Sequence, residues 1–229
     1  PAAQVELDPL RQEIRAVAAG ARSPMEVESF VQVHGGASGV VEVICKDGKR
    51  YALKGGRLKK QVVAEHIVGR LGQLLKAPVL PPLFAEIPAD LRNAQPQLAA
   101  LGLGVSHAVP WLHNCSNKLQ LAHIDAPENR QRFASLCVLY TWTWSNDPQL
   151  FYLNTEPRLV NSFDHAYFIY PGQGNWNEGN LAGAPPVTAW DPFFAGCNLV
   201  SIELKEAAKE LESITVEDLL AVVLSLIHI

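Results

Sequence analysis

The sequence HGGASGVVEVICKDGKRYALK, residues 34–54, decides the first half of the fold. It contains two runs of strand-forming residues, 40–45 and 51–54, separated by the tight-turn pair Asp47-Gly48. Another apolar run, 30–33, comes just before the glycine-rich stretch with which the quoted sequence begins. The pattern therefore predicts three antiparallel strands, with a glycine-rich loop between the first two and a two-residue hairpin between the last two.

The segments on either side of this meander have helical periodicity. Apolar residues at roughly helical spacing predict an amphipathic helix within residues 1–24, before the meander. After it, Val63, Ile67 and Leu71 fall on one stripe of a predicted helix over 60–75, which ends before a group of prolines. A strand over 80–87 and a short helix within 88–104 are expected to follow.

The second half of the chain is expected to be mainly helical. Residues 130–144 predict a helix that runs into a polar loop over 145–154. A short strand, 159–163, comes next and is followed by a long loop over 171–186, rich in Gly, Asn and Pro. Two helices are expected within 200–226, and Thr215 with Asp218 is a candidate capping pair for the second.

This order of elements predicts the fold class. Strands come mostly first and helices mostly after, which favours α+β over a parallel βαβ sheet. We therefore expect one domain over residues 1–229, with an N-terminal helix (1–24), a strand-rich part (25–104) and a mainly helical part (105–229).

Composition excludes several classes of protein. The chain has 229 residues, 48% hydrophobic and 18% charged, with a net charge of −4, so it has the material for a sizeable core. Neither nucleic-acid binding nor a polybasic membrane surface is expected from this charge. The longest apolar run, 219–229, is shorter than the roughly 20 residues that span a bilayer. Four scattered cysteines and no signal-peptide pattern at the N-terminus predict reduced thiols and a cytoplasmic protein.

Four features occur in an order that suits phosphoryl transfer. Backbone N–H groups of a glycine turn can approach phosphates, since no Cβ blocks them. Lys54, at the end of a strand, is placed to pair with phosphate oxygens, with Glu65 on the next helix holding it. Of two late aspartates, Asp164 is placed to hold a metal ion and Asp147 to accept the proton of the nucleophile. The turn residues concerned are Gly35, Gly36, Ser38 and Gly39.

The same features resemble those of HipA-like kinase domains. Residues 51–54 and Glu65 look like the lysine and helix of that family, and 144–147 (WSND) resembles its catalytic loop. Residues 161–166 (NSFDHA) are similar to its metal-binding strand, with Ala166 where Gly is usual. The likeness covers about residues 30–168. It implies a two-lobed, protein-kinase-like fold with a small antiparallel-sheet N-lobe and a mainly helical C-lobe, and an ATP- and Mg²⁺-dependent kinase that modifies protein Ser or Thr.

The chain departs from this family at the catalytic loop. Kinases of this type place an Asn, a second metal ligand, five residues after the loop aspartate, and here that position is Tyr152. Asn154 or Asn146 is the candidate substitute, of which Asn154 is our prediction. Pro148 also stands where the family often has a basic residue. These departures put catalysis in question more than the fold.

Alternatives remain at the level of the sequence. Asp147 lies in an Asn-Asp-Pro tripeptide that commonly forms turns, Asp164 could cap a strand end, and Glu65 could be an exposed helix residue. The function is accordingly a protein kinase, or a nucleotide-binding pseudokinase that acts as an interaction module, or an α+β binding protein without a nucleotide.

Overall fold

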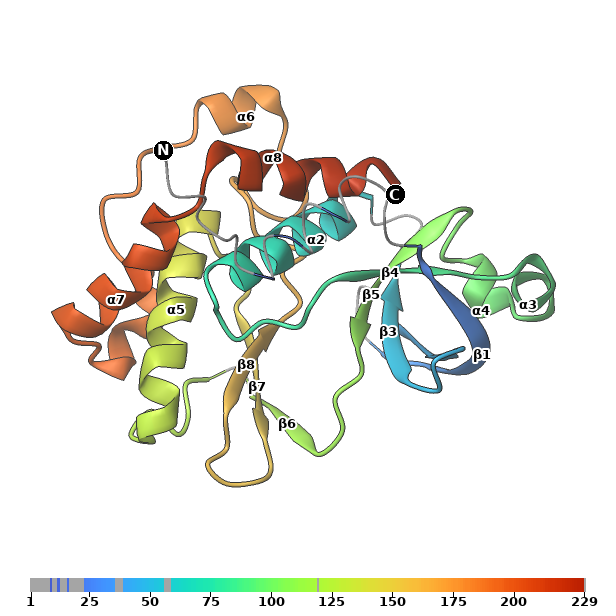
Figure 1. The fold of residues 1–229 in the computed structure, drawn as a ribbon, viewed down its shortest axis with the longest axis horizontal. Helices are drawn as coiled ribbons and strands as arrows, with labels where there is room; N and C mark the ends of the chain where they lie inside the picture. Colours follow the sequence, from blue (N-terminus) through green and yellow to red (C-terminus); the bar gives the residue numbers. More distant parts are fainter. Residues whose placement is uncertain are drawn as a thin grey trace, which may run out of the picture.

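The structure is a computed structural model, and it describes residues 23–35, 39–55, 59–118 and 120–228, together with residues 9, 12 and 16. The helix predicted within residues 1–24 therefore lies almost wholly outside the described residues. What is described is a mixed α+β fold, as the order of elements predicted (Figure 1).

The strand-rich part is a closed five-stranded barrel. Its order is β1-β2-β3-β5-β4, and the parallel pairing of Met25 with Ala85 closes the ring between β1 and β4. The interior is filled by small and medium apolar side chains, among them Val43, Leu53 and Ala108, all buried. The strands are β1 (Met25–Val33), β2 (Val41–Cys45), β3 (Arg50–Lys54), β4 (Leu83–Glu86) and β5 (Val105–Pro110).

The barrel corrects two expectations. The antiparallel meander β1-β2-β3 is confirmed, but the sheet is not an open antiparallel one, since β1 pairs in parallel with β4. The boundary expected after residue 104 is also displaced, since β5 pairs with both β3 and β4 and belongs to the barrel. Both errors concern pairings between segments distant in sequence, which strand periodicity does not encode.

A second, smaller sheet carries the residues after the barrel. Its three antiparallel strands are β6 (Cys115–Lys118), β7 (Gln149–Leu153) and β8 (Val160–Phe163). The prediction of a polar loop over 145–154 is therefore wrong, because β7 occupies half of it. Leu150 and Tyr152 of β7 are buried in the helical core, and this packing makes a strand of a segment whose polar flanks favour a loop.

The helices predicted within 60–75, 130–144 and 200–226 are present with small shifts in their ends, and two short helices lie where one was predicted within 88–104. In Figure 1, α2 lies between the barrel and α5, whereas α3 and α4 lie on the other side of the barrel. Val68, Leu71 and Leu74 of α2 pack into the same core as Phe133 and Leu139 of α5. The helices are α2 (Lys59–Leu74), α3 (Ala89–Ala94), α4 (Pro96–Ala99), α5 (Pro127–Thr143), α6 (Glu178–Ala182), α7 (Ser201–Glu212) and α8 (Val216–Leu224), with 3₁₀ turns η2 (Pro192–Cys197) and η3 (Ser225–His228).

Two smaller expectations are confirmed. The Thr215 hydroxyl accepts a hydrogen bond from the Asp218 backbone N–H and the Asp218 carboxylate accepts one from the Thr215 backbone N–H, which is the predicted capping box of α8. All four cysteines have free thiols. Within the described part of the chain, no helix combines the length and apolarity needed to cross a bilayer.

Candidate active site

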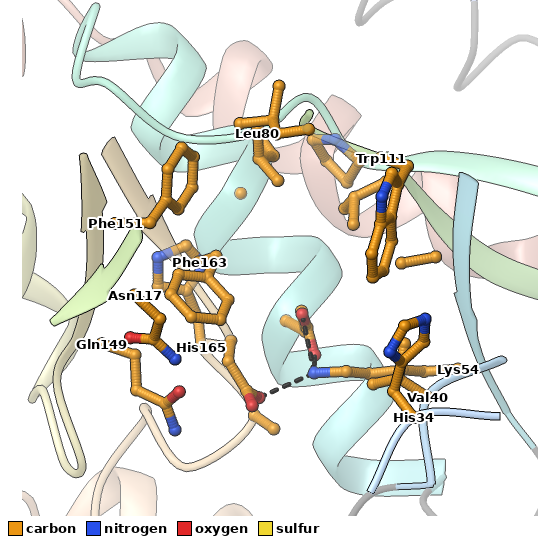
Figure 2. Close-up of a pocket in the computed structure, with 18 of the residues that line it drawn as sticks. His34, Val40, Lys54, Leu80, Trp111, Asn117, Gln149, Phe151, Phe163 and His165 are labelled. Carbon is orange, nitrogen blue, oxygen red and sulfur yellow. Dashed lines mark hydrogen bonds and ion pairs between the residues drawn. The ribbon is translucent and has the colours of Figure 1, made fainter. Parts of the chain in front are cut away.

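A cavity of about 750 Å³ opens where the barrel, α2 and the small sheet meet (Figure 2). The barrel contributes Ala52 and Lys54, α2 contributes Glu65, and the small sheet contributes Phe151 and Phe163. Its volume is in the range of small-molecule sites, about 300–1,000 Å³. The predicted site residues Gly35, Asp147 and Asp164 also line it.

Lys54 lies at the centre of a three-residue charge cluster in this cavity. Its Nζ is 2.8 Å and 3.1 Å from the two carboxylate oxygens of Glu65, and 2.7 Å from Oδ1 of Asp164 (Figure 2). Lys54 is the last residue of β3, Glu65 lies in the second turn of α2, and Asp164 directly follows β8. Residues 11 and 110 positions away from Lys54 thus converge on one ammonium group.

Because this cluster is largely buried, the charge of each of its side chains is stabilised mainly by the other two. The Lys54 and Glu65 side chains are only 7% and 5% exposed, whereas Asp164 is 24% exposed and faces the cavity. Burial alone lowers the pKa of Lys54, but the adjacent carboxylates of Glu65 and Asp164 outweigh it and hold that pKa above its usual value. Glu65 is therefore not an exposed helix residue, and Asp164 pairs with Lys54 instead of capping a strand.

Asp147 lies at the edge of the same cavity. It is exposed and adopts a left-handed backbone conformation, with φ of 59°. Its Oδ2 is 3.4 Å from Nε2 of Gln149, a long hydrogen bond. Asp147 thus forms the turn that its tripeptide favours and also presents a carboxylate to the cavity, so the two interpretations of this residue are compatible.

The glycine-rich turn is described only at its two ends. Gly35 lines the cavity, and Gly39 has a φ of +58°, a conformation that residues with a Cβ rarely adopt. Gly36 and Ser38 lie outside the described residues. Their predicted contact with phosphate stays a prediction.

The structure does not bring Asn154 to Asp164. In the β7–β8 hairpin, Gln149 is paired with Phe163, the residue before Asp164. Asn154 comes five residues after Gln149. At about 3.3 Å per strand residue, it lies roughly 16 Å from the end of the hairpin that carries Asp164. It cannot share a metal ion with Asp164, and this part of the site prediction is wrong. The alternative Asn146 packs its side chain against Gly172, where a φ of +91° and the lack of space for a Cβ both require glycine.

Tyr152 also points away from the cavity. Side chains alternate along β7, so Gln149 and Phe151 line the cavity whereas Leu150 and Tyr152 enter the core. The Tyr152 hydroxyl accepts a hydrogen bond from the backbone N–H of Ala122. An Asn placed at this position would face the core, not a metal ion.

The sequence did not identify the walls of the cavity. His34 and Trp111 stack with ring centroids 4.5 Å apart, and Phe151 and Phe163 lie on another wall at 5.5 Å (Figure 2). Asn117 and Gln149 add two carboxamides to the lining. The one available signal was the apolar and aromatic run 150–153, which is too short to distinguish a strand from other buried structure.

A buried histidine lies behind the charge cluster. His107 pairs with Lys54 across β5 and β3, is 1% exposed, and places Nε2 3.9 Å from Oε1 of Glu65. Neither of its ring nitrogens has a hydrogen-bond partner among the described residues. Burial, together with the positive charges of Lys54 and Arg70, lowers the pKa of His107 to about 3. The ring is therefore neutral at physiological pH.

This histidine predicts a loss of stability in acid. Between the usual histidine pKa and about 3, the unfolded chain binds a proton at His107 that the folded protein does not bind, so stability falls as pH falls. At about 1.4 kcal/mol per pH unit, the loss between pH 7 and pH 5 is ~2 kcal/mol. Urea unfolding of His107→Leu at both pH values should show a loss smaller by that amount than wild type. His113→Asn, at an exposed position, should behave as wild type, and equal losses in His107→Leu and wild type would contradict the assignment.

Comparisons with known proteins add little to this geometry. No protein-family model matches the chain, and no curated protein matches it either. Among solved structures, the chain is similar to the Helicobacter pylori proinflammatory kinase CtkA, at 9% sequence identity and a TM-score of 0.47. The match covers 88% of this chain and 90% of that one. A likeness at this level is too weak to indicate a function, so the residues of the cavity must do so.

Proposed function

We propose that this protein is a kinase-like phosphotransferase that uses ATP and Mg²⁺, with two lobes that enclose the cavity. The observation that carries the proposal is the contact of the Lys54 ammonium with both Glu65 and Asp164 inside a cavity of nucleotide size. A lysine held by a helix glutamate, next to a metal-binding aspartate, is the arrangement that protein kinases use on ATP phosphates.

The lining of the cavity is suited to a nucleotide. Val40, Ala52, Phe151 and Trp111 supply apolar surface and rings for a base, while Lys54 supplies a cation for phosphate oxygens. Asp164 would hold Mg²⁺, which takes one or two carboxylates and completes its shell with phosphates and water. Such an ion would neutralise charge on the β- and γ-phosphates. Asp164 is the more exposed of the two carboxylates on Lys54, so it is free to turn toward such an ion.

Asp147 is assigned the role of proton acceptor. An acceptor hydroxyl attacks the γ-phosphorus, a new O–P bond forms, the bond to the β-phosphate oxygen breaks, and ADP leaves. The hydroxyl proton passes to the Asp147 carboxylate, which is exposed at the mouth and reachable by a bulky acceptor. On the resemblance described above, we propose that the acceptor is a serine or threonine of another protein in the cytoplasm.

A pseudokinase remains a second candidate, and one observation favours it. The position expected to supply a second metal ligand holds Tyr152, and its side chain is buried in the core. Turnover separates the two: ATP binding without formation of phosphorylated protein would select the pseudokinase.

Mg-ATP is expected to raise the melting temperature of the protein. A ligand that binds only the folded state stabilises it by about 2.7 kcal/mol at a concentration 100 times its dissociation constant. Differential scanning fluorimetry with Mg-ATP, with ATP plus EDTA, and with inorganic phosphate tests this. A wild-type protein whose melting temperature is the same with and without millimolar Mg-ATP would reject both the kinase and the pseudokinase, and leave the nucleotide-free binding protein.

A further inference from the structure

Two carboxamide side chains lie side by side on the floor of the cavity. Asn117 of β6 is paired with Phe151 of β7, and Gln149 precedes Phe151 by two residues on the same strand. Paired residues, and residues two apart on one strand, point to the same face of a sheet. Asn117 and Gln149 therefore lie on the same face as Phe151, which lines the cavity, and in Figure 2 both lie below the Phe151 ring.

These carboxamides lie between the apolar and the charged ends of the cavity. Phe151, beside Asn117, belongs to the ring-lined part. Gln149 is paired with Phe163, directly before Asp164, and its Nε2 is 3.4 Å from Asp147. A path along this face from Phe151 to Asp164 thus passes Gln149.

A nucleotide has its sugar in the corresponding position. This inference rests on the proposed function, in which the base lies on the rings and the phosphates lie on Lys54. In that binding mode the sugar lies over the two carboxamides. A carboxamide carries both a hydrogen-bond acceptor and donors, as pairing with a hydroxyl requires. Asn117 makes no side-chain hydrogen bond within the described part of the chain, and the one bond that Gln149 makes there is long. Both groups are free to bind a ligand.

We infer that Asn117 and Gln149 bind the sugar hydroxyls and select ribonucleotides over deoxyribonucleotides. Removing one hydroxyl leaves one carboxamide without its partner, which lowers affinity by roughly 5- to 30-fold. Wild type should therefore bind Mg-ATP more tightly than Mg-2′-deoxy-ATP or Mg-3′-deoxy-ATP by a factor of this size.

Isothermal titration with the three nucleotides at saturating Mg²⁺ tests the inference on wild type, Asn117→Leu and Gln149→Met. Each variant keeps the approximate volume of the side chain and removes its hydrogen-bonding groups. Each variant should bind ATP more weakly than wild type does. Its affinity for the deoxynucleotide that lacks the hydroxyl bound by the removed carboxamide should be unchanged. The variant should therefore no longer prefer ATP over that deoxynucleotide. Asn154→Leu, the same substitution at an exposed position just beyond the far end of β7, should keep the wild-type preference.

Several outcomes would overturn the inference. Equal losses for all three nucleotides in a variant would indicate a general effect on the cavity. A defect in Gln149→Met that appears only when the titration is repeated below saturating Mg²⁺, with the sugar preference intact, would assign this carboxamide to the metal. Wild-type protein that binds all three nucleotides equally would reject the sugar role alone. Wild-type protein that binds none of them would reject the proposed function as well.

Discussion

Asp147→Asn is expected to slow phosphoryl transfer by roughly 10²- to 10⁴-fold, the usual contribution of a general base. The carboxamide cannot take up the proton of the acceptor hydroxyl, whereas it has nearly the same shape as the carboxylate. Mg-ATP affinity should stay at the wild-type level, because Asp147 does not contact Lys54, Glu65 or Asp164 through any hydrogen bond of the described residues. The measurement is the initial rate of phosphorylated-protein formation, beside ATP affinity by titration.

The choice of asparagine separates the two roles of Asp147. With φ at 59°, most substitutions would strain the turn, but Asn adopts this conformation nearly as readily as Asp. The variant should therefore melt at the wild-type temperature. Asp90→Asn, on the exposed surface of α3, is the matched control and should leave the rate unchanged. A wild-type rate in Asp147→Asn would reduce this residue to a turn former.

The sequence predicted the charge cluster well because each member has a local signal. Lys54 ends a short apolar strand after a tight-turn pair, Glu65 lies on a helix with a clear apolar stripe, and Asp164 follows a short strand. The order of the elements indicated the fold class for the same reason. Periodicity identifies such elements one at a time, and the likeness of their order to the kinase arrangement implied that the three side chains converge.

The parts that failed depend on pairing between strands. Closure of the barrel joins β1 to β4, and β5 enters between β3 and β4, through contacts that no local pattern encodes. The error at Asn154 has the same origin. Because β7 was predicted as a loop, its residues could not be assigned a pairing register. Asn154 was chosen because it is near Asp147 in sequence, which does not make it near in space. Once Gln149 is paired with Phe163, Gln149 reaches the cavity and Asn154 does not.

Lys54→Met is expected to destabilise the protein by about 3–5 kcal/mol, the usual cost of removing one partner from a buried ion pair. Methionine fills much of the volume, but the carboxylate of Glu65, 5% exposed, is left without its countercharge. Urea unfolding of the variant and wild type at neutral pH measures the difference. Mg-ATP should no longer raise the melting temperature of the variant, because the cation for the phosphates is gone.

Two further measurements separate loss of charge balance from loss of packing. One measurement is urea unfolding of Lys54→Leu, whose apolar side chain should leave the Glu65 carboxylate equally without a countercharge and cost about the same stability as Lys54→Met. Lys54→Met/Glu65→Leu removes both charges and should regain much of the lost stability at neutral pH, since buried ion pairs are often replaceable by apolar residues. ATP should still fail to stabilise the double variant. A double variant as unstable as the single one would show that Lys54 matters through packing, and restored ATP binding would remove Lys54 from the proposed site.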